Sequence, residues 1–249
     1  MKSLVVGNWK LYINSIAEGK KLLRGIDKGL PRGMKAEVVV CPQIPLAVAL
    51  RAGYGGKRIT FGTQDAFTEE SGAHTGEASP RALVNSGLEY VIIGHAERRL
   101  LGDTDEIVAK KAAAGLAAGL RAIVCVGELE RDQEGGHFAH LAKNVKQSLA
   151  RIELSDVSRL TIAYDPLWAI GNAEPPSPRI VAEAVMFIRK TLAELWGREK
   201  ALKVRIIYGG SVNAESAEGF VKTGGVQGFL IGRASVDPQE FTTIIRAWK

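Results

Sequence analysis

Eight short apolar runs alternate with amphipathic stretches from one end of the chain to the other. The runs are largely continuous rather than alternating in polarity, which is typical of parallel strands buried on both faces. They cover residues 4–7, 37–41, 58–62, 90–93, 121–126, 160–164, 204–208 and 228–231.

The stretches between the runs carry helix signals. Residues 15–18 (Ser-Ile-Ala-Glu) have the pattern of a capping box, and Ile16, Leu23 and Ile26 then fall on one helical face. Ser177 and Pro178 suit an N-cap and a first helical residue. The alternation therefore predicts about eight strand-then-helix units.

Regular strand–helix alternation indicates a parallel sheet, and eight units in 249 residues have the size of a closed (β/α)8 barrel. No Pro- or Ser-rich linker interrupts the pattern, so we predict a single α/β barrel domain over residues 1–249. A doubly wound open sheet is the structural alternative. Its dinucleotide-binding form is disfavoured because no GxGxxG follows the first run.

The composition indicates the class of protein and the compartment in which we expect it. The chain is 46% hydrophobic and 24% charged, and no apolar run approaches the roughly 18 residues of a membrane helix. The N-terminus enters a strand at once, without the pattern of a signal or transit peptide. Cys41 and Cys125 lie in apolar runs, which favours buried, reduced thiols over a disulfide. We therefore expect a cytoplasmic protein with no membrane partner.

The formal net charge of +6 raises the question of an anionic partner. Lysine and arginine are scattered, however, and form no basic stripe with interleaved aromatic residues. We therefore predict no nucleic-acid partner, and a small phosphorylated substrate explains the positive charge more economically.

Chemistry gathers at the carboxyl ends of the strands in a (β/α)8 barrel. The residues that follow the predicted strands are a lysine, a histidine, two carboxylates and two glycine-rich turns: Lys10, His95, Glu97, Asp165, residues 209–213 and residues 232–235. Each alone has a structural explanation, as a surface lysine, a hydrogen-bonded histidine, a surface ion pair or a turn. Their coincidence at one end of one barrel is what indicates a site.

Turns after the seventh and eighth strands commonly bind phosphate in such barrels. With a lysine, an imidazole and a carboxylate nearby, the set suits proton transfer next to a carbonyl group. His74, His137 and His140 are not grouped with metal ligands, so we interpret them as surface or loop residues and predict neither a metal nor a cofactor.

The motifs GNWK, YVIIGHAERR, AYDPLWAIG, IIYGGSVNAES and GFLIGRASV, in this order, resemble those of the triosephosphate isomerase family. VCVGE also fits, and SGAHTGE resembles the protruding dimer loop of that family. The resemblance spans nearly the whole chain. It implies a TIM barrel that interconverts glyceraldehyde 3-phosphate and dihydroxyacetone phosphate through an enediol(ate), a step of glycolysis and gluconeogenesis.

The resemblance also implies a role for each matching residue. Lys10 would stabilise the enediolate, a neutral His95 would polarise the carbonyl, Glu97 would orient Lys10, and Asp165 would be the base. The residues implied in substrate binding are Asn8, Lys10, Gly171, Ser211, Gly232 and Arg233. Residues 166–176 would form a lid that closes over the site, and the loop 72–77 would dock in a homodimer.

Several departures from the family pattern lie at the site. Asp165 replaces the base glutamate, which places its carboxylate on the order of 1 Å short. Ala96 replaces a serine, and Arg233 replaces a glycine, which would be strained if its φ were positive. Residues 173–176 (Ala-Glu-Pro-Pro) would stiffen the lid.

These departures leave three hypotheses open. The chain is a triosephosphate isomerase, with a reduced rate as one variant of that hypothesis. Alternatively, it is an isomerase of a larger sugar phosphate such as a tetrulose phosphate. A third hypothesis is a phosphate-binding barrel that has lost efficient catalysis.

Overall fold

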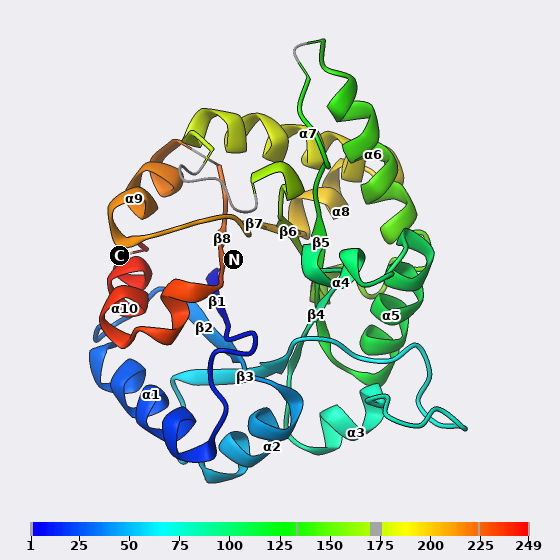
Figure 1. Cartoon of the computed structure of the whole chain (residues 1–249). Coiled ribbons are helices and arrows are strands. Elements are labelled where there is room, and N and C mark those ends of the chain that lie inside the picture. The colour runs from blue at the N-terminus through cyan, green and yellow to red at the C-terminus, as the bar shows by residue number, and fades with distance from the viewer. Residues whose placement is uncertain (1, 133, 170–175, 224, 249) are drawn as a thin grey trace.

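The computed structural model describes residues 2–132, 134–169, 176–223 and 225–248. Its eight strands are all parallel and form a closed barrel in sequence order, with β8 pairing to β1 (Figure 1). This closure confirms the barrel and excludes the open sheet. The strands are β1 (Ser3–Asn8), β2 (Ala36–Cys41), β3 (Ile59–Thr63), β4 (Tyr90–Ile93), β5 (Arg121–Val126), β6 (Leu160–Tyr164), β7 (Arg205–Tyr208) and β8 (Gly228–Ile231).

The helices surround the barrel as an outer ring (Figure 1). The α-helices are α1 (Ile16–Gly29), α2 (Ile44–Gly53), α3 (Pro80–Asn85), α4 (Ala96–Leu100), α5 (Asp105–Ala118), α6 (Gly136–Ser148), α7 (Pro178–Trp196), α8 (Arg198–Lys203), α9 (Ala214–Thr223) and α10 (Pro238–Arg246). Three 3₁₀ turns add η1 (Val157–Arg159), η2 (Leu167–Ala169) and η3 (Arg233–Val236).

The helix starts follow the predicted signals with two differences. Ser15 Oγ accepts from the Glu18 amide at 3.2 Å, but Glu18 returns its bond to the amide of Asn14 rather than that of Ser15. Leu23 and Ile26 are buried as predicted, whereas Ile16 is 45% exposed. The buried part of this helical face therefore begins after Ile16.

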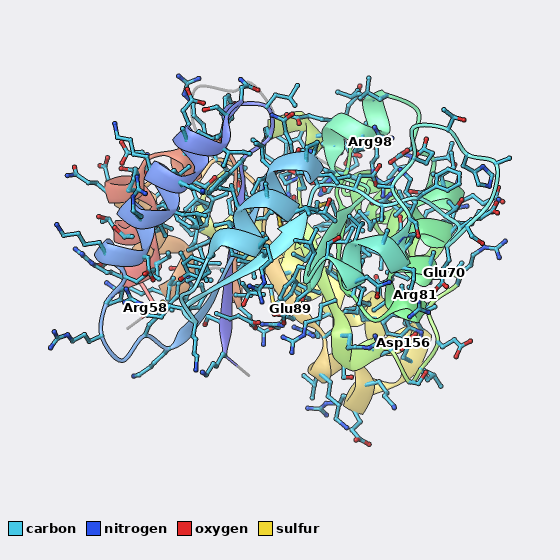
Figure 2. The ribbon with its side chains drawn as sticks, turned by 90° about the horizontal axis from the view of Figure 1, so that it is seen from below. Arg58, Glu70, Arg81, Glu89, Arg98 and Asp156 are labelled. Carbon is cyan, nitrogen blue, oxygen red and sulfur yellow. The ribbon has the colours of Figure 1, made fainter. Side chains whose placement is uncertain are left out.

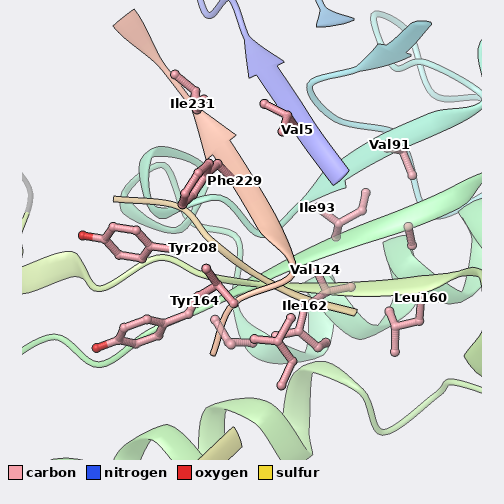
Figure 3. Packing of buried hydrophobic residues seen from close by; sticks show 14 of the residues in the cluster. Val5, Val91, Ile93, Val124, Leu160, Ile162, Tyr164, Tyr208, Phe229 and Ile231 are labelled. Carbon is pink, nitrogen blue, oxygen red and sulfur yellow. The ribbon is translucent and has the colours of Figure 1, made fainter. Parts of the chain in front are cut away.

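Alternate strand residues belong to two separate apolar clusters. One contains strand residues and helix residues together, so it fills the layer between the barrel and the helices (Figure 3). The other contains strand residues alone, among them Leu4, Val6, Ile123, Cys125 and Ala163, and fills the barrel interior. Continuous apolar runs are thus explained, because both faces of each strand are buried.

The two ends of the barrel interior differ in chemistry. At the amino end of the strands, Glu37 accepts from Arg121 and Arg205 at 3.0 and 3.1 Å, and the Tyr90 hydroxyl accepts from Arg121 at 2.9 Å. These contacts join strands at the amino end of the barrel. At the carboxyl end, polar side chains instead line a cavity.

A long loop between β3 and α3 extends away from the barrel (Figure 1). Its residues 72–77 are all exposed. Two contacts hold its base, since Arg81 pairs with the Glu70 carboxylate at 3.0 Å and Ser79 Oγ donates to the Glu70 carbonyl at 2.6 Å (Figure 2). The loop is therefore presented outward on a fixed support.

Both cysteines are buried and free, which confirms the expected thiols. The expectation for His137 was wrong, because it is only 4% exposed, packs on Phe138 and lies 3.3 Å from Asp132. In the part of the chain that the structure describes, no helix is long and apolar enough to cross a membrane.

Candidate active site

A cavity of about 530 Å³ opens at the carboxyl ends of the strands. Seven of the residues predicted from the sequence line it: Lys10, His95, Glu97, Asp165, Ser211, Gly232 and Arg233. Asn8 is buried and does not line the cavity, but its side chain contacts the backbone of Lys10, which does. Gly171 and most of the predicted lid 166–176 lie outside the described residues.

Lys10 follows β1 in an unusual conformation. Its φ is +46°, and it is the one non-glycine residue with positive φ within the described ranges. Asn8 Oδ1 accepts from the Lys10 amide at 3.2 Å, and Gln64 Nε2 donates to the Lys10 carbonyl at 3.0 Å. The peptide groups on both sides of Lys10 are therefore fixed, and its Nζ lies 2.6 Å from Glu97 Oε1.

His95 ends the turn after β4 and caps α4. Its Nδ1 accepts a hydrogen bond from the Glu97 amide at 3.2 Å, so Nδ1 carries no proton in this arrangement. The proton of the neutral ring then sits on Nε2, which lies 3.8 Å from Asp165 Oδ2. The ring therefore presents an N–H donor toward the cavity.

Asp165 shares its side of β6 with Ala163, so it points into the mouth of the barrel. It is 5% exposed, and its Oδ2 accepts from the Ala96 amide at 3.3 Å. A Cβ on Gly127 would collide with the Asp165 carbonyl oxygen, and one on Gly209 would lie 3.2 Å from Asp165 Cβ. Glycine directly after both neighbouring strands thus leaves room for the main chain and the Cβ of Asp165.

Burial raises the pKa of the nearby Cys125 thiol and of the Tyr208 hydroxyl, and the charge of Asp165 raises both further. Both groups consequently stay protonated at neutral pH. Neither adds charge beside the Asp165 carboxylate.

Glu128, after β5, holds the first residues that follow Asp165. Its Oε1 accepts from the Trp168 indole at 2.9 Å and from the Tyr164 hydroxyl at 2.8 Å. Its carbonyl accepts from the Leu167 amide at 3.1 Å. Glu128 is 2% exposed, and burial together with this carboxylate raises the pKa of Tyr164. The start of the predicted lid is thus tied to a buried carboxylate.

Ser211 follows β7, while Gly232 and Arg233 follow β8. A Cβ on Gly232 would lie 3.3 Å from Lys10 Cε, so glycine permits this loop to approach the lysine closely. Arg233 has no positive φ, and the strain considered for it does not arise. Its guanidinium lies over the ring of Tyr12, with Cζ 5.7 Å from the ring centre.

The comparisons with known proteins agree with this geometry. The family model described as triosephosphate isomerase matches residues 3–248. The chain belongs to the triosephosphate isomerase family. It is 39% identical to the triosephosphate isomerase of Thermoanaerobacter pseudethanolicus, with 98% of both chains covered. It is 38% identical to those of Carboxydothermus hydrogenoformans, over 98% of both chains, and Chloroflexus aurantiacus, over 97% of both.

Among the departures from the triosephosphate isomerase pattern, Ala96 has a clear structural consequence. Alanine offers no hydroxyl at this position, and the carboxylate of Asp165 receives the backbone N–H of Ala96 instead. That bond needs no particular side chain at position 96. The contact between position 96 and the Asp165 carboxylate therefore does not require a hydroxyl at this position.

Four residues with a clear place in this triosephosphate isomerase site were given no role from the sequence: Tyr12, Gln64, Gly127 and Glu128. Gln64 directly follows β3, and Gly127 and Glu128 directly follow β5, so they stand at strand ends like the predicted residues. Position after a strand is a signal that they share with the predicted residues, but for Gln64 and Glu128 only the hydrogen-bond partner shows the role. Tyr12 has no such signal, and its contact with Arg233 and its place in the cavity lining show its position.

Proposed function

We propose that this chain interconverts D-glyceraldehyde 3-phosphate and dihydroxyacetone phosphate by proton transfer through an enediol(ate), as an intramolecular oxidoreductase that needs no cofactor. One observation carries the proposal. The Asp165 carboxylate, the His95 imidazole and the Lys10 ammonium group, from three different strands, line one cavity in a member of the triosephosphate isomerase family. The relatives cited above all bear the name triosephosphate isomerase.

The chemistry divides among these side chains. Asp165 removes the proton from the carbon next to the carbonyl and returns it to the neighbouring carbon. The Nε2–H of His95 donates to the carbonyl oxygen and shuttles a proton between the two oxygens. Lys10 supplies positive charge to the developing oxyanion. Glu97, 2.6 Å from Lys10 Nζ, sets the position of that charge.

The phosphate would bind at the loops after β7 and β8. Ser211, Gly232 and Arg233 line the cavity there, which supports a cradle of backbone N–H groups. We include Gly171 and the lid 166–176 from the family pattern. The lid would exclude water from the enediolate, and the hold of Glu128 on Trp168 and Leu167 supports a fixed hinge at its start.

The comparisons give no support to an isomerase of larger sugar phosphates or to a barrel without catalysis. Neither is part of the proposal.

A coupled isomerase assay tests it directly. The chain is offered glyceraldehyde 3-phosphate, and in parallel a panel of tetrose and pentose phosphates. We expect turnover of the triose phosphate, abolished in Asp165→Asn while a phosphate analogue still binds. Turnover restricted to a larger sugar phosphate would overturn the choice of substrate. An unchanged rate in Asp165→Asn would remove Asp165 from the mechanism.

We further propose a homodimer formed through the loop 72–77. Large apolar side chains after β1 and at the end of α4 support an interface beside the site: Leu11 is 70% exposed, Leu100 is 73% and Leu101 is 76%. Sedimentation should give the mass of a dimer at micromolar concentration, and a monomer alone would refute it. We place the protein in the cytoplasm, where its two free thiols stay reduced, without a nucleic-acid or membrane partner.

A further inference from the structure

The guanidinium group of Arg233 lies beside the cavity and packs on an aromatic ring. It lies over the Tyr12 ring at 5.7 Å, and both residues line the cavity. Within the described ranges, Arg233 makes no ion pair with a carboxylate. An exposed arginine stacked on an aromatic face keeps its in-plane N–H donors available.

The charged side chains around the cavity distinguish Arg233 from Lys10. Among the residues that the structure describes, the lining contains two cations, Lys10 and Arg233, and two carboxylates, Glu97 and Asp165, whose formal charges cancel. Lys10 is already engaged by Glu97 at 2.6 Å. Of the cations that line the described cavity, Arg233 is therefore the one left to meet an incoming dianion.

We propose that the Arg233 guanidinium, oriented by the ring of Tyr12, binds the phosphate of the substrate directly. The loop after β8 then contributes a charged side chain in addition to backbone N–H groups. A planar guanidinium matches two phosphate oxygens at once, which a lysine ammonium cannot do. This inference rests on the proposed function, because it places the phosphate of that substrate in this cavity.

The position of Arg233 predicts which kinetic constant it controls. The phosphate is the non-reacting end of the substrate, and its contact with Arg233 is made both before and during proton transfer. Interactions of that kind lower KM more than they raise kcat. Arg233 is thus a binding residue, and Tyr12 is a positioning residue that acts through it.

Arg233→Met tests the inference, since methionine keeps much of the side chain and removes the charge and the donors. Binding of inorganic phosphate is measured by calorimetry and, in the isomerase assay, as competitive inhibition. We expect phosphate binding to weaken by roughly 10- to 100-fold, with KM rising in parallel and kcat falling less. Arg233→Lys should recover only part of the lost phosphate affinity, because lysine restores the positive charge without the planar pair of N–H donors.

Arg24→Met is the matched control. Arg24 is exposed on α1 and does not line the cavity, so this variant removes the same charge from the chain at a remote place. Its phosphate binding should equal that of the wild type. A loss as large as that of Arg233→Met would mean that net charge alone is responsible, and would overturn the inference.

Two substitutions separate the ring of Tyr12 from its hydroxyl. Tyr12→Leu should weaken phosphate binding about two- to fivefold, whereas Tyr12→Phe keeps the ring and should retain wild-type binding. The effect of Tyr12→Leu should disappear in an Arg233→Met background. An equal effect with and without the arginine would contradict a positioning role.

Calorimetry and the isomerase assay together distinguish a failure of the proposed function from a failure of this inference. If the wild type does not isomerise triose phosphates but binds inorganic phosphate through Arg233, the proposed function fails and the arginine contact stands. If the wild type isomerises triose phosphates and Arg233→Met binds phosphate as well as the wild type, this inference fails and the proposed function stands.

Discussion

Replacing Asp165 by glutamate tests how far the candidate base lies from the carbon it deprotonates. The backbone on both sides of Asp165 is fixed: its amide donates to the Val126 carbonyl at 2.8 Å, and the Leu167 amide donates to the Glu128 carbonyl at 3.1 Å. The main chain is therefore not free to advance toward the substrate. Because the aspartate side chain is shorter than that of glutamate, its carboxylate therefore lies farther from the substrate.

The size of the effect follows from this geometry. One methylene group moves the carboxylate by about 1 Å, and a misplacement of that size costs about 100-fold in rate, or about 2.7 kcal/mol. Free aspartic and glutamic acids differ by only about 0.4 in pKa, or about 0.5 kcal/mol. The position of the carboxylate should therefore affect the rate more than its basicity does. The extra methylene has space, since Asp165 faces a cavity of about 530 Å³.

The assay couples formation of dihydroxyacetone phosphate to oxidation of NADH and yields kcat and KM separately. We expect Asp165→Glu to raise kcat by about 100-fold, with a smaller change in KM. Asp165→Asn is the matched control for charge, and thermal unfolding of both variants controls for stability. A kcat equal to or below that of the wild type would refute the reasoning, because it would mean that the site is already fitted to aspartate.

Three other changes have defined outcomes. Lys10→Met should lower kcat/KM by about 100- to 1000-fold, since it removes the cation at the developing oxyanion, and near-normal kinetics would exclude that role. Gly127→Ala should destabilise the fold by about 1–3 kcal/mol in urea denaturation, because its Cβ collides with the backbone of Asp165; unchanged stability would show that this strand end can yield. Burial raises the thiol pKa of Cys41 and Cys125, so the folded chain keeps protons that the unfolded chain releases. The free energy of unfolding should therefore not depend on these thiols below about pH 8.5, and should fall above it by up to about 1.4 kcal/mol per pH unit per thiol. Chemical unfolding between pH 8 and 10 measures this slope. A flat profile would contradict it.

The barrel could be predicted from the sequence because its strands are buried on both faces. A continuous apolar run then marks each strand, and all eight predicted runs agree with the structure to within one residue at either end. Burial on helices was less predictable. Periodicity places Ile16 on the same helical face as Ile26, but it does not say which positions on that face are covered by a neighbouring element. His137 is buried because α6 packs on α7 through Phe138 and Phe187, whose ring centres are 4.7 Å apart.

The parts of the site that escaped prediction depend on contacts between distant segments. Gln64 donates to the Lys10 carbonyl 54 residues away, and Glu128 accepts from Trp168 across 40 residues. A glutamine or a glutamate after a strand is common, and only the partner distinguishes these two. The catalytic candidates were easier, because lysine, histidine and aspartate at strand ends have recognisable chemistry even without their partners.

The net charge of the chain is a poor guide to the proposed phosphate site. The chain carries +6, yet the charges of the two cations and two carboxylates among the described lining residues cancel. The excess positive charge therefore lies elsewhere and, screened over about 8–10 Å at physiological salt, contributes little at the site. Attraction for a phosphate must then come from groups within hydrogen-bonding reach, which are backbone N–H groups and the guanidinium of Arg233. For this reason the remote Arg24→Met and the local Arg233→Met, identical in net charge, should differ in phosphate affinity.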